Sequence, residues 1–415
     1  MKRLAYLTLI GLIATSCTTI RVRKAFQAGA LPSQASGVLI QELESQKVVF
    51  QHQADQFFMP ASNAKLVTFL EANRILPDSI PAYRYLETTD TLYFWGTGDP
   101  SLLHPTLHGD ALLKKLMATS KVLVLADSDE NIRPMGDGWA WDDYQDSYAA
   151  EISSIPMYNN QVRISIQDGQ TKVEPSYFAE QVKTGNSKFV KRDRNSNQIE
   201  IPSLRAMPEQ TIPYITSAKQ TADLLAYQVN KPILHLPKAF DAHAVLAYAG
   251  KTDSLYLPML HQSDNQLAEQ LLYLIAAQKN WVGPTLNIIE NLKKEDSFLL
   301  PFKWVDGSGL SRYNLMRPQD LVSVLMQLKK EVSEERLFKL LPESGKTGTI
   351  RKMIPTEKKA RFYAKSGSFG NTYNLSGYYL NAQGKTYVFS IMGNLGNRSA
   401  TAMKQDVMLL LNALH

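Results

Sequence analysis

The sequence predicts an α/β fold in which the two ends of the chain build one sheet and a mainly β region is inserted between them. Near the start, Gly37–Phe50 contains two apolar runs separated by a polar turn, a pattern typical of a hairpin. Near the end, Asn374–Leu380 and Thr386–Met392 have the composition of strands, with a turn at Gln383–Gly384 between them. The chain then closes with apolar helical spacing at Thr401–Leu414.

The middle of the chain has a different sequence pattern. Residues 81–245 hold short alternating segments broken by Gly, Pro, Asp and Asn, such as Thr91–Trp95 and Val122–Leu125. We therefore expect residues 18–80 and 246–415 to form one domain, with one or two small domains inserted at 81–245. The length of 415 residues allows two or three domains. Helices are predicted from near Ser62, at Asn265–Ala277 and at Pro318–Leu328.

The first residues are typical of an export signal. A basic Met1–Arg3 precedes an apolar run at Leu4–Ile13 and small residues at Ala14–Ser16. The apolar run is shorter than the roughly 20 residues that a bilayer-spanning helix needs. Cys17, the only cysteine, follows directly and resembles a bacterial lipoprotein processing site. We predict an exported, periplasmic protein; anchoring through a lipidated Cys17 and simple signal cleavage both stay open.

Composition and charge narrow the function further. With 44% hydrophobic and 20% charged residues, the chain is an ordinary globular protein. A formal charge of +6 without a long basic stretch argues against nucleic acid as a partner. A single cysteine and the lack of H-E-x-x-H predict neither a metal nor another cofactor. The lack of G-x-S-x-G disfavours a Ser-His-Asp hydrolase.

The first motif that carries chemistry is Ser62-Asn63-Ala64-Lys65, an S-x-x-K pattern at the start of a predicted helix. Residues i and i+3 share one helix face, so the Lys65 amine can reach the Ser62 hydroxyl. The amine acts as a base only when it is neutral, which requires burial or a neighbouring cation to lower its pKa. Alone, the motif is also compatible with a solvated lysine, but the apolar helix that follows favours burial of the pair.

The second motif is Ser263-Asp264-Asn265, directly before a predicted helix. Its simplest interpretation is an N-cap, because Ser, Asp and Asn are the preferred capping residues. The functional alternative has Ser263 relaying a proton to a leaving amine and the Asn265 amide orienting a substrate peptide bond.

The third motif occurs in two versions, Lys346-Thr347-Gly348 and Lys365-Ser366-Gly367. A K-[ST]-G motif must lie on a strand edge, where its backbone pairs with substrate and its hydroxyl meets a carboxylate. Charged residues and Pro355 follow the first version, whereas the second leads into the predicted strands near the C-terminus. We therefore predict that Lys365 is the functional lysine and that Lys346 is not.

S-x-x-K, S-x-N and K-[ST]-G in this order resemble the pattern of penicillin-binding proteins and serine β-lactamases. The long interval between the first two motifs is similar to that of the class C low-molecular-mass penicillin-binding proteins, the D-alanyl-D-alanine carboxypeptidase/endopeptidase family. Other segments match the same family: Gly96–Leu102, Trp141–Asp143, Tyr148–Ala150, Asp306–Asn314 and Leu341–Thr349. The resemblance implies a serine β-lactamase/penicillin-binding transpeptidase-like domain, an antiparallel sheet with helices on both faces. Ser366 departs from the usual Thr but keeps the hydroxyl.

The resemblance also implies a mechanism without metal or cofactor. Ser62, deprotonated by Lys65, would attack the carbonyl of the penultimate D-Ala of peptidoglycan stem peptides, and β-lactams would acylate the same serine. Ser263, Asn265 and Lys365 would complete the catalytic set. Ser366, Gly367 and Ser368 would bind substrate, with the Ser62 and Ser368 N–H groups holding the oxyanion. Two alternatives remain: a serine β-lactamase, and a non-catalytic cell-wall binding protein. The sequence is silent on oligomeric state.

Overall fold

The computed structural model describes residues 17–415 except 34, 128–131, 242 and 397. The predicted export segment, Met1–Ser16, lies outside the described residues. Cys17 is exposed and begins helix α1 (Cys17–Ala28), and its lipidation remains a prediction. Within the part of the chain that the structure describes, every helix falls short of the length and apolar character needed to cross a bilayer.

The chain divides into two compact units. The first unit takes the described residues up to Asn63 together with Leu315–His415, and the second is Ala64–Asn314. The first unit therefore contains both ends of the described chain, whereas the second is one continuous segment. The division at 80 and 246 that the sequence suggested remains a prediction.

The first unit is built on an antiparallel sheet of five strands in the order β14-β15-β16-β1-β2. Its strands are β1 (Ala35–Glu42), β2 (Val48–His52), β14 (Arg361–Phe369), β15 (Thr372–Leu380) and β16 (Thr386–Asn394). The central pairing of β1 with β16 joins the two ends of the chain. The predicted hairpin, C-terminal strands and shared sheet are thus confirmed.

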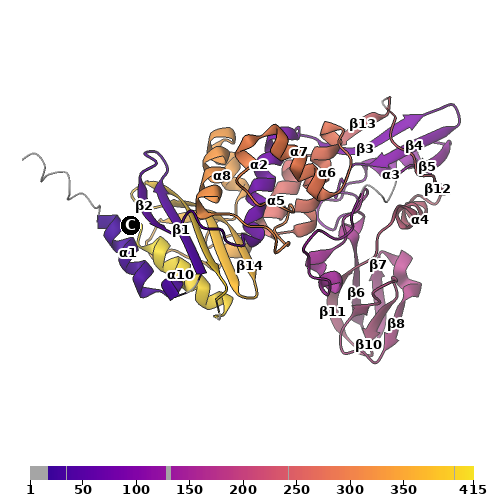
Figure 1. Ribbon diagram of the computed structural model, residues 1–415. Helices are drawn as coiled ribbons and strands as arrows, with labels where there is room; N and C mark the ends of the chain where they lie inside the picture. The colour runs from indigo at the N-terminus through magenta and orange to yellow at the C-terminus, as the bar shows by residue number, and fades with distance from the viewer. Residues whose placement is uncertain (1–16, 34, 128–131, 242, 397) are drawn as a thin grey trace, which may run out of the picture. The chain divides into compact units, whose positions relative to one another are not determined.

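Helices cover both faces of this sheet. On one face, α1 and α10 (Ala400–Asn412) lie side by side and share a core with the inward residues of the strands (Figure 1). On the other face lies α8 (Pro318–Glu331), against β1, β15 and β16. The alternation of β15 makes this visible: Tyr379 belongs to the first core, whereas the neighbouring Tyr378 donates its hydroxyl to the Leu325 carbonyl of α8 at 2.6 Å. A short α9 (Glu334–Leu340) packs against α8.

In the second unit, four helices form a bundle: α2 (Lys65–Ile75), α5 (Asp253–His261), α6 (Asn265–Lys279) and α7 (Thr285–Glu295). Helix α6 packs against the other three. It is buried continuously from Gln266 to Ala276, because neighbours surround it on all sides. Polar residues on this helix are therefore taken out of water and need partners inside the protein.

The rest of the second unit is mainly β, as predicted for residues 81–245. A mixed sheet has the order β12-β5-β4-β3-β13, and two smaller sheets have the orders β11-β6-β7 and β8-β10-β9. The mixed sheet contains β3 (Ile80–Glu87), β4 (Thr91–Gly96), β5 (Val122–Leu125), β12 (Ile233–His235) and β13 (Val245–Ala249). The smaller sheets contain β6 (Gln161–Gln167), β7 (Gln170–Glu174), β8 (Val182–Gly185), β9 (Lys191–Arg192), β10 (Ile199–Pro202) and β11 (Met207–Pro213). Helices α3 (Ala111–Met117) and α4 (Ala218–Val229) complete the region.

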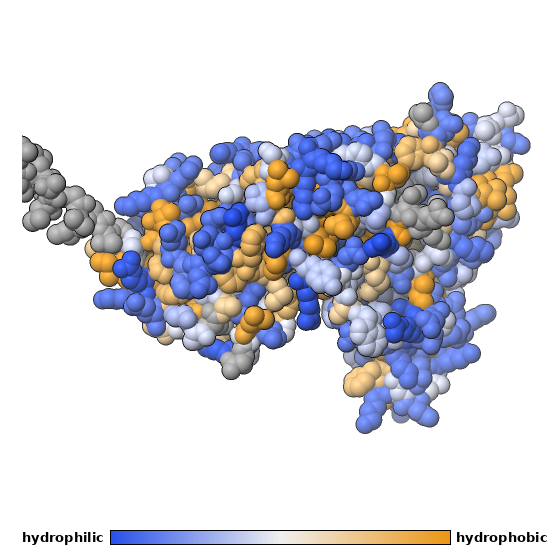
Figure 2. All heavy atoms as spheres, in the orientation of Figure 1, coloured by the Kyte–Doolittle hydropathy of each residue, from blue (hydrophilic) through white to orange (hydrophobic). Residues whose placement is uncertain are grey.

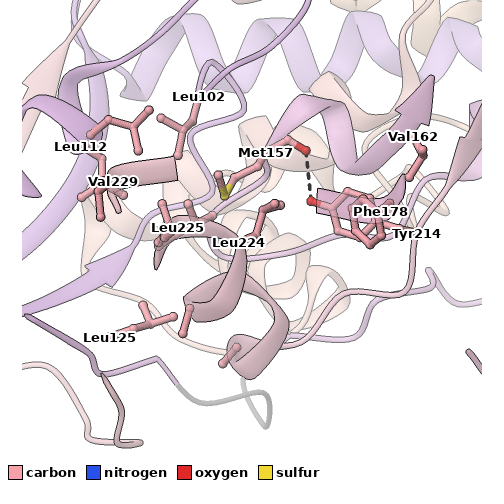
Figure 3. Packing of buried hydrophobic residues seen from close by; sticks show 14 of the residues in the cluster. Leu102, Leu112, Leu125, Met157, Val162, Phe178, Tyr214, Leu224, Leu225 and Val229 are labelled. Carbon is pink, nitrogen blue, oxygen red and sulfur yellow. Dashed lines mark hydrogen bonds between the residues drawn. The ribbon is translucent and has the colours of Figure 1, made fainter. Parts of the chain in front are cut away.

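One apolar core runs through these sheets. Figure 3 shows Leu224 and Leu225 of α4 near Met157, with the rings of Phe178 and Tyr214 beside them. The Tyr214 hydroxyl donates to the Met157 carbonyl at 3.0 Å. This bond gives both buried polar groups a hydrogen-bond partner inside the apolar core. On the face drawn in Figure 2, hydrophilic residues cover much of the surface and hydrophobic ones interrupt them.

Candidate active site

Ser62 lies in a single helical turn, η3 (Ala61–Ala64), which runs directly into α2. The backbone of Ala61 is left-handed, with φ of 47°, a conformation that costs a non-glycine residue about 1–3 kcal/mol and persists only where the surroundings impose it. The Ser62 side chain is half-buried, and Ala61 and Asn63 on either side are buried. The serine is thus held on a constrained turn at the start of a helix.

Polar side chains from the sheet fix this turn within the first unit. The buried Asn63 amide donates to the Ser376 hydroxyl at 2.9 Å, which in turn donates to Ser390 at 2.9 Å. The Asn394 amide oxygen accepts the Met59 N–H at 2.7 Å. These hydrogen bonds tie the segment before and after Ser62 to β15 and β16. No local pattern in the sequence indicates the Asn63–Ser376 and Met59–Asn394 bonds, because their partners are 313 and 335 residues apart along the chain.

The Lys365–Ser368 segment lies on β14, which is an edge strand of the sheet. The Ala364 N–H on the outer side of β14 bonds to Pro342. Because successive residues of a strand alternate, the N–H groups of Ser366 and Ser368 point to the same outer side. This end of the strand therefore presents backbone donors of the kind that pair with an extended peptide.

Gly367 has a distinct steric role. A Cβ atom there would lie 2.6 Å from the Pro60 carbonyl oxygen and 2.9 Å from the Ser62 nitrogen. The backbone of β14 therefore packs directly against the turn that carries Ser62, at a distance only glycine permits. The structure brings these two motifs of the first unit together.

The two candidate lysines differ in surroundings. Lys365 is fully buried, and its Nζ donates to the Ser366 carbonyl at 2.7 Å. The Ser366 hydroxyl lies 2.6 Å from that of Thr349. Lys346 instead has a side chain 68% exposed and forms a surface ion pair with Glu343. Burial and position on an edge strand favour Lys365 as the functional residue.

Lys65 is the centre of a polar cluster in the second unit. It is fully buried, and its Nζ donates to the Asn265 amide oxygen and to the Ser308 carbonyl, both at 2.6 Å. Burial lowers the pKa of Lys65 from 10.5 to about 8, against the opposing influence of Asp306, Glu269 and Asp264. The solvated lysine considered above is thus excluded, and a substantial fraction of this amine is neutral at mildly alkaline pH.

In the Ser263–Asn265 motif, one residue caps helix α6 and another contacts Lys65. Asp264 is the N-cap of α6 and accepts the Leu267 N–H at 3.0 Å. Asn265 holds Lys65 through its oxygen, and its Nδ2 donates to the Tyr148 carbonyl at 2.8 Å. Ser263 is half-buried in a left-handed conformation with φ of 63°. Of the predicted residues in the second unit, the structure thus joins Lys65 directly to Asn265.

Two buried carboxyl groups near Lys65 were not predicted. Glu269 accepts the Ser308 N–H at 2.7 Å and the Gly307 N–H at 3.2 Å. Burial and the charge of Asp306 raise the pKa of Glu269 well above 4.5. A signal was present in the sequence: Glu269 follows Asn265 by four residues in an apolar helix, which puts both on one face.

Asp306 organises the loop that meets Lys65. Its carboxylate accepts the N–H groups of Gly309 (2.8 Å) and Ser311 (2.6 Å), the Asn314 amide (2.7 Å) and the Trp139 indole (2.8 Å). The Asp306–Asn314 segment was recognised only as a family match. Its role in the structure is to turn the Ser308 carbonyl toward Lys65. Among the described residues, no group of three or more His, Cys, Asp or Glu side chains could hold a metal ion.

The family model described as the D-Ala-D-Ala carboxypeptidase 3 (S13) family matches residues 18–207 and 227–414. The chain belongs to this family. The D-alanyl-D-alanine carboxypeptidase DacB of Haemophilus influenzae is 24% identical over 403 residues, covering 85% of this chain and 84% of that one. A D-alanyl-D-alanine carboxypeptidase of Actinomadura sp. strain R39 is 22% identical over 439 residues, covering 91% and 81%.

Solved structures show the S13 fold. Penicillin-binding protein 4 (dacB) of Haemophilus influenzae superposes with a TM-score of 0.74 at 22% identity, covering 95% of this chain and 98% of that one. The Bd0816 predatory endopeptidase of Bdellovibrio bacteriovorus, in complex with immunity protein Bd3460, gives 0.52 at 14% identity, covering 91% and 92%. The predicted family and its transpeptidase-like fold are confirmed.

Proposed function

We propose that this S13 family member is a serine D-alanyl-D-alanine carboxypeptidase/endopeptidase, with Ser62 as the acylated nucleophile and Lys65 as its base. The observation that carries the proposal is the fully buried Lys65 amine, one helical turn after Ser62 and hydrogen-bonded to Asn265 and Ser308. A neutral amine has two N–H groups, and these two oxygens accept them. Its lone pair then serves to take the proton of the serine hydroxyl.

The chemistry proceeds in two steps. The Ser62 Oγ attacks the carbonyl carbon of the penultimate D-Ala while its proton passes to Lys65. The N–H groups of Ser62 and Ser368 stabilise the oxyanion, and Ser263 relays a proton to the departing amine. Collapse of the intermediate breaks the peptide bond and leaves an ester on Ser62. Water then attacks the ester, releases the shortened peptide and restores the serine.

The substrate-binding role falls to β14. The outward N–H groups of Ser366 and Ser368 support pairing with the extended end of a stem peptide. Lys365 adds positive potential for the terminal carboxylate, and the Ser366 hydroxyl can donate to it. The same groups suit β-lactams, and a β-lactam complex is known for the penicillin-binding protein 4 of Haemophilus influenzae. Because such substrates are outside the cytoplasm, we also propose that the chain is exported to the periplasm by its N-terminal segment.

The deciding experiment is intact mass spectrometry of the full chain after incubation with benzylpenicillin, with Ser62→Ala beside the wild type. A stable adduct on the wild type alone supports Ser62 as the nucleophile. Release of D-Ala from a synthetic stem peptide then tests the substrate, and rapid loss of the adduct would indicate a β-lactamase instead. No adduct on folded wild-type protein would overturn the proposal in favour of a binding protein.

A further inference from the structure

The second unit contains a cavity of about 420 Å³ that none of the proposed catalytic residues lines. It lies between the end of β4, the segment after β12 and the C-terminal end of α6. Its polar and aromatic lining includes Arg84, Trp95, Asp127, Lys238, Phe240 and Trp281. Its volume is within the range of about 300–1,000 Å³ that is typical of small-ligand sites.

Arg84 is the unusual residue of this cavity. It is only 7% exposed, and burial lowers its pKa from 12.5. Its guanidinium donates to the Ala277 carbonyl and the Asn280 amide oxygen at 2.5 Å, and it stacks on the Phe240 ring at 4.7 Å from the centroid. Among the described residues no carboxylate forms an ion pair with it. A buried cation held only by neutral groups is costly, so a cavity beside it favours an anion.

The other charged groups do not cancel this preference. The Asp127 carboxylate accepts the Gly96 N–H at 2.9 Å, which holds it at the end of β4. Lys238 is exposed on the rim and adds a second cation, whose Nζ lies 5.1 Å from the Tyr93 ring centroid. Of the described residues that line the cavity, Arg84 and Lys238 are cationic and Asp127 is the one carboxylate.

One side of the cavity is formed by the start of Gly96–Leu102, a segment that matched the family in the sequence analysis but received no role there. Gly96, Thr97 and Gly98 line the cavity. A Cβ on Gly98 would lie 2.6 Å from the Tyr273 Cβ, and its φ is 88°. The strand end can thus lie close against α6, and the rings of Phe240 and Trp281 also line the cavity. These rings offer apolar faces for the body of a ligand.

We infer that this cavity is a second ligand site, distinct from Ser62, for a carboxylate borne on an apolar or ring-shaped body. Arg84 and Lys238 bind the carboxylate, and Phe240 and Trp281 contact the body. The choice of peptidoglycan fragments as the ligands rests on the proposed function. In peptidoglycan such a carboxylate has two sources: the lactyl group of those N-acetylmuramic acid residues that carry no stem peptide, and the free α-carboxylate of the γ-linked D-Glu within a stem peptide. Either would hold a wall fragment away from the bond being cut.

The test is to titrate the full chain with each probe and to measure binding by isothermal titration calorimetry and by saturation-transfer NMR. The probes are N-acetylmuramic acid, N-acetylglucosamine as the same ring without the carboxylate, and the peptide L-Ala-γ-D-Glu-L-Lys. Binding of the muramic acid but not of N-acetylglucosamine places the carboxylate on the sugar; binding of the peptide alone places it on the stem. Binding of neither acid overturns the inference.

Variants separate the cavity from the catalytic centre. Arg84→Gln and Lys238→Ala should each weaken binding by about tenfold, because a charged hydrogen bond is lost. Since Arg84 also holds the end of α6, Trp281→Ala offers a second variant that leaves this contact intact. Arg205→Gln and Phe189→Ala, at exposed positions elsewhere in the second unit, are matched controls and should bind as the wild type.

Prior acylation with benzylpenicillin completes the design. Retained binding to the acylated protein supports a separate site, whereas loss of binding would put the ligand at Ser62 and overturn the inference. If the protein is not acylated at all, the proposed function fails while the cavity can still be tested, so the two failures are distinguishable.

Discussion

The Lys65 Nζ atom lies 2.6 Å from the Ser308 carbonyl oxygen, and the whole Lys65 side chain is buried. A carbonyl can accept from a neutral amine as well as from a charged one, and the Asn265 oxygen can do the same. These two acceptors thus orient the amine in either protonation state. Burial lowers its pKa to about 8 against the charges of Asp306, Glu269 and Asp264, and a base one turn from a serine requires such a lowering.

Replacement of Lys65 by Arg tests the base directly. Arg can donate to the same two oxygens, but it stays protonated at every accessible pH. We expect the rate of acylation by benzylpenicillin to fall by about 10²–10⁴-fold, the usual contribution of a positioned base. Mass spectrometry over time measures the rate, and circular dichroism checks the fold. An Arg variant that acylates at the wild-type rate would exclude Lys65 as the base.

The pH dependence of acylation follows from the same residue. Since the pKa of Lys65 is lowered to about 8, the neutral fraction grows with pH and levels off above that value. The rate should therefore rise by about tenfold per pH unit well below 8 and reach a plateau above it. Stopped-flow acylation between about pH 6 and 9 measures this. A flat profile would mean that Lys65 does not supply the titrating base.

Glu269→Gln tests whether Glu269 holds the Asp306–Asn314 loop in place. Both Glu269 oxygens accept backbone N–H groups, and an amide replaces one acceptor by a donor. We expect the free energy of unfolding to fall by about 1–3 kcal/mol. Because the Ser308 carbonyl shifts with its loop, acylation should also slow, by about tenfold. Glu209→Gln, at an exposed position, is the matched control.

The same variant should change how stability depends on pH. The pKa of Glu269 is raised in the folded state, so above pH 4.5 the folded protein binds more protons than the unfolded chain. This contribution is full at low pH and is lost as the pH rises through the folded pKa. The difference in melting temperature between wild type and Glu269→Gln should therefore shrink with rising pH. A constant difference would contradict the raised pKa.

Lys365 and Lys346 form a natural pair for comparison. Lys365→Ala removes a buried amine from the edge strand, and we expect acylation to fall by about 10²–10⁴-fold. Lys346→Ala removes a solvent-screened surface ion pair and should leave the rate unchanged. Kinetics of labelling with a fluorescent penicillin distinguish them. Loss of activity in the Lys346 variant instead would reverse the assignment.

The sequence predicted those parts of the fold and site that depend on local pattern. The hairpin, the C-terminal strands and the Ser62 helix follow from apolar periodicity, and the three motifs are short. Contacts between distant segments, such as Asn63 with Ser376, leave no local signature. Glu269 was partly predictable from its spacing to Asn265, but the direction of its pKa depends on burial and on Asp306. Periodicity alone does not show that α6 is buried all round.

Gly367→Ala tests the packing of β14 on the serine turn, a contact that links two of the motifs within the first unit. The new Cβ would lie 2.6 Å from the Pro60 oxygen and 2.9 Å from the Ser62 nitrogen, both backbone atoms that cannot rotate away. The strand and the turn must separate, which we expect to cost about 1–3 kcal/mol of unfolding free energy. A displacement of the Ser62 N–H by about 1 Å would slow acylation by about 10²-fold.

Gly370→Ala is the matched control for this prediction, because a Cβ there meets no atom within 4 Å. It changes the same residue type three positions along the same segment and should leave both the melting temperature and the acylation rate close to wild type. Differential scanning fluorimetry and penicillin labelling of the two variants, side by side, measure both quantities. Equal behaviour of the two would show that β14 does not press on the Ser62 turn and that a Cβ atom is tolerated at position 367.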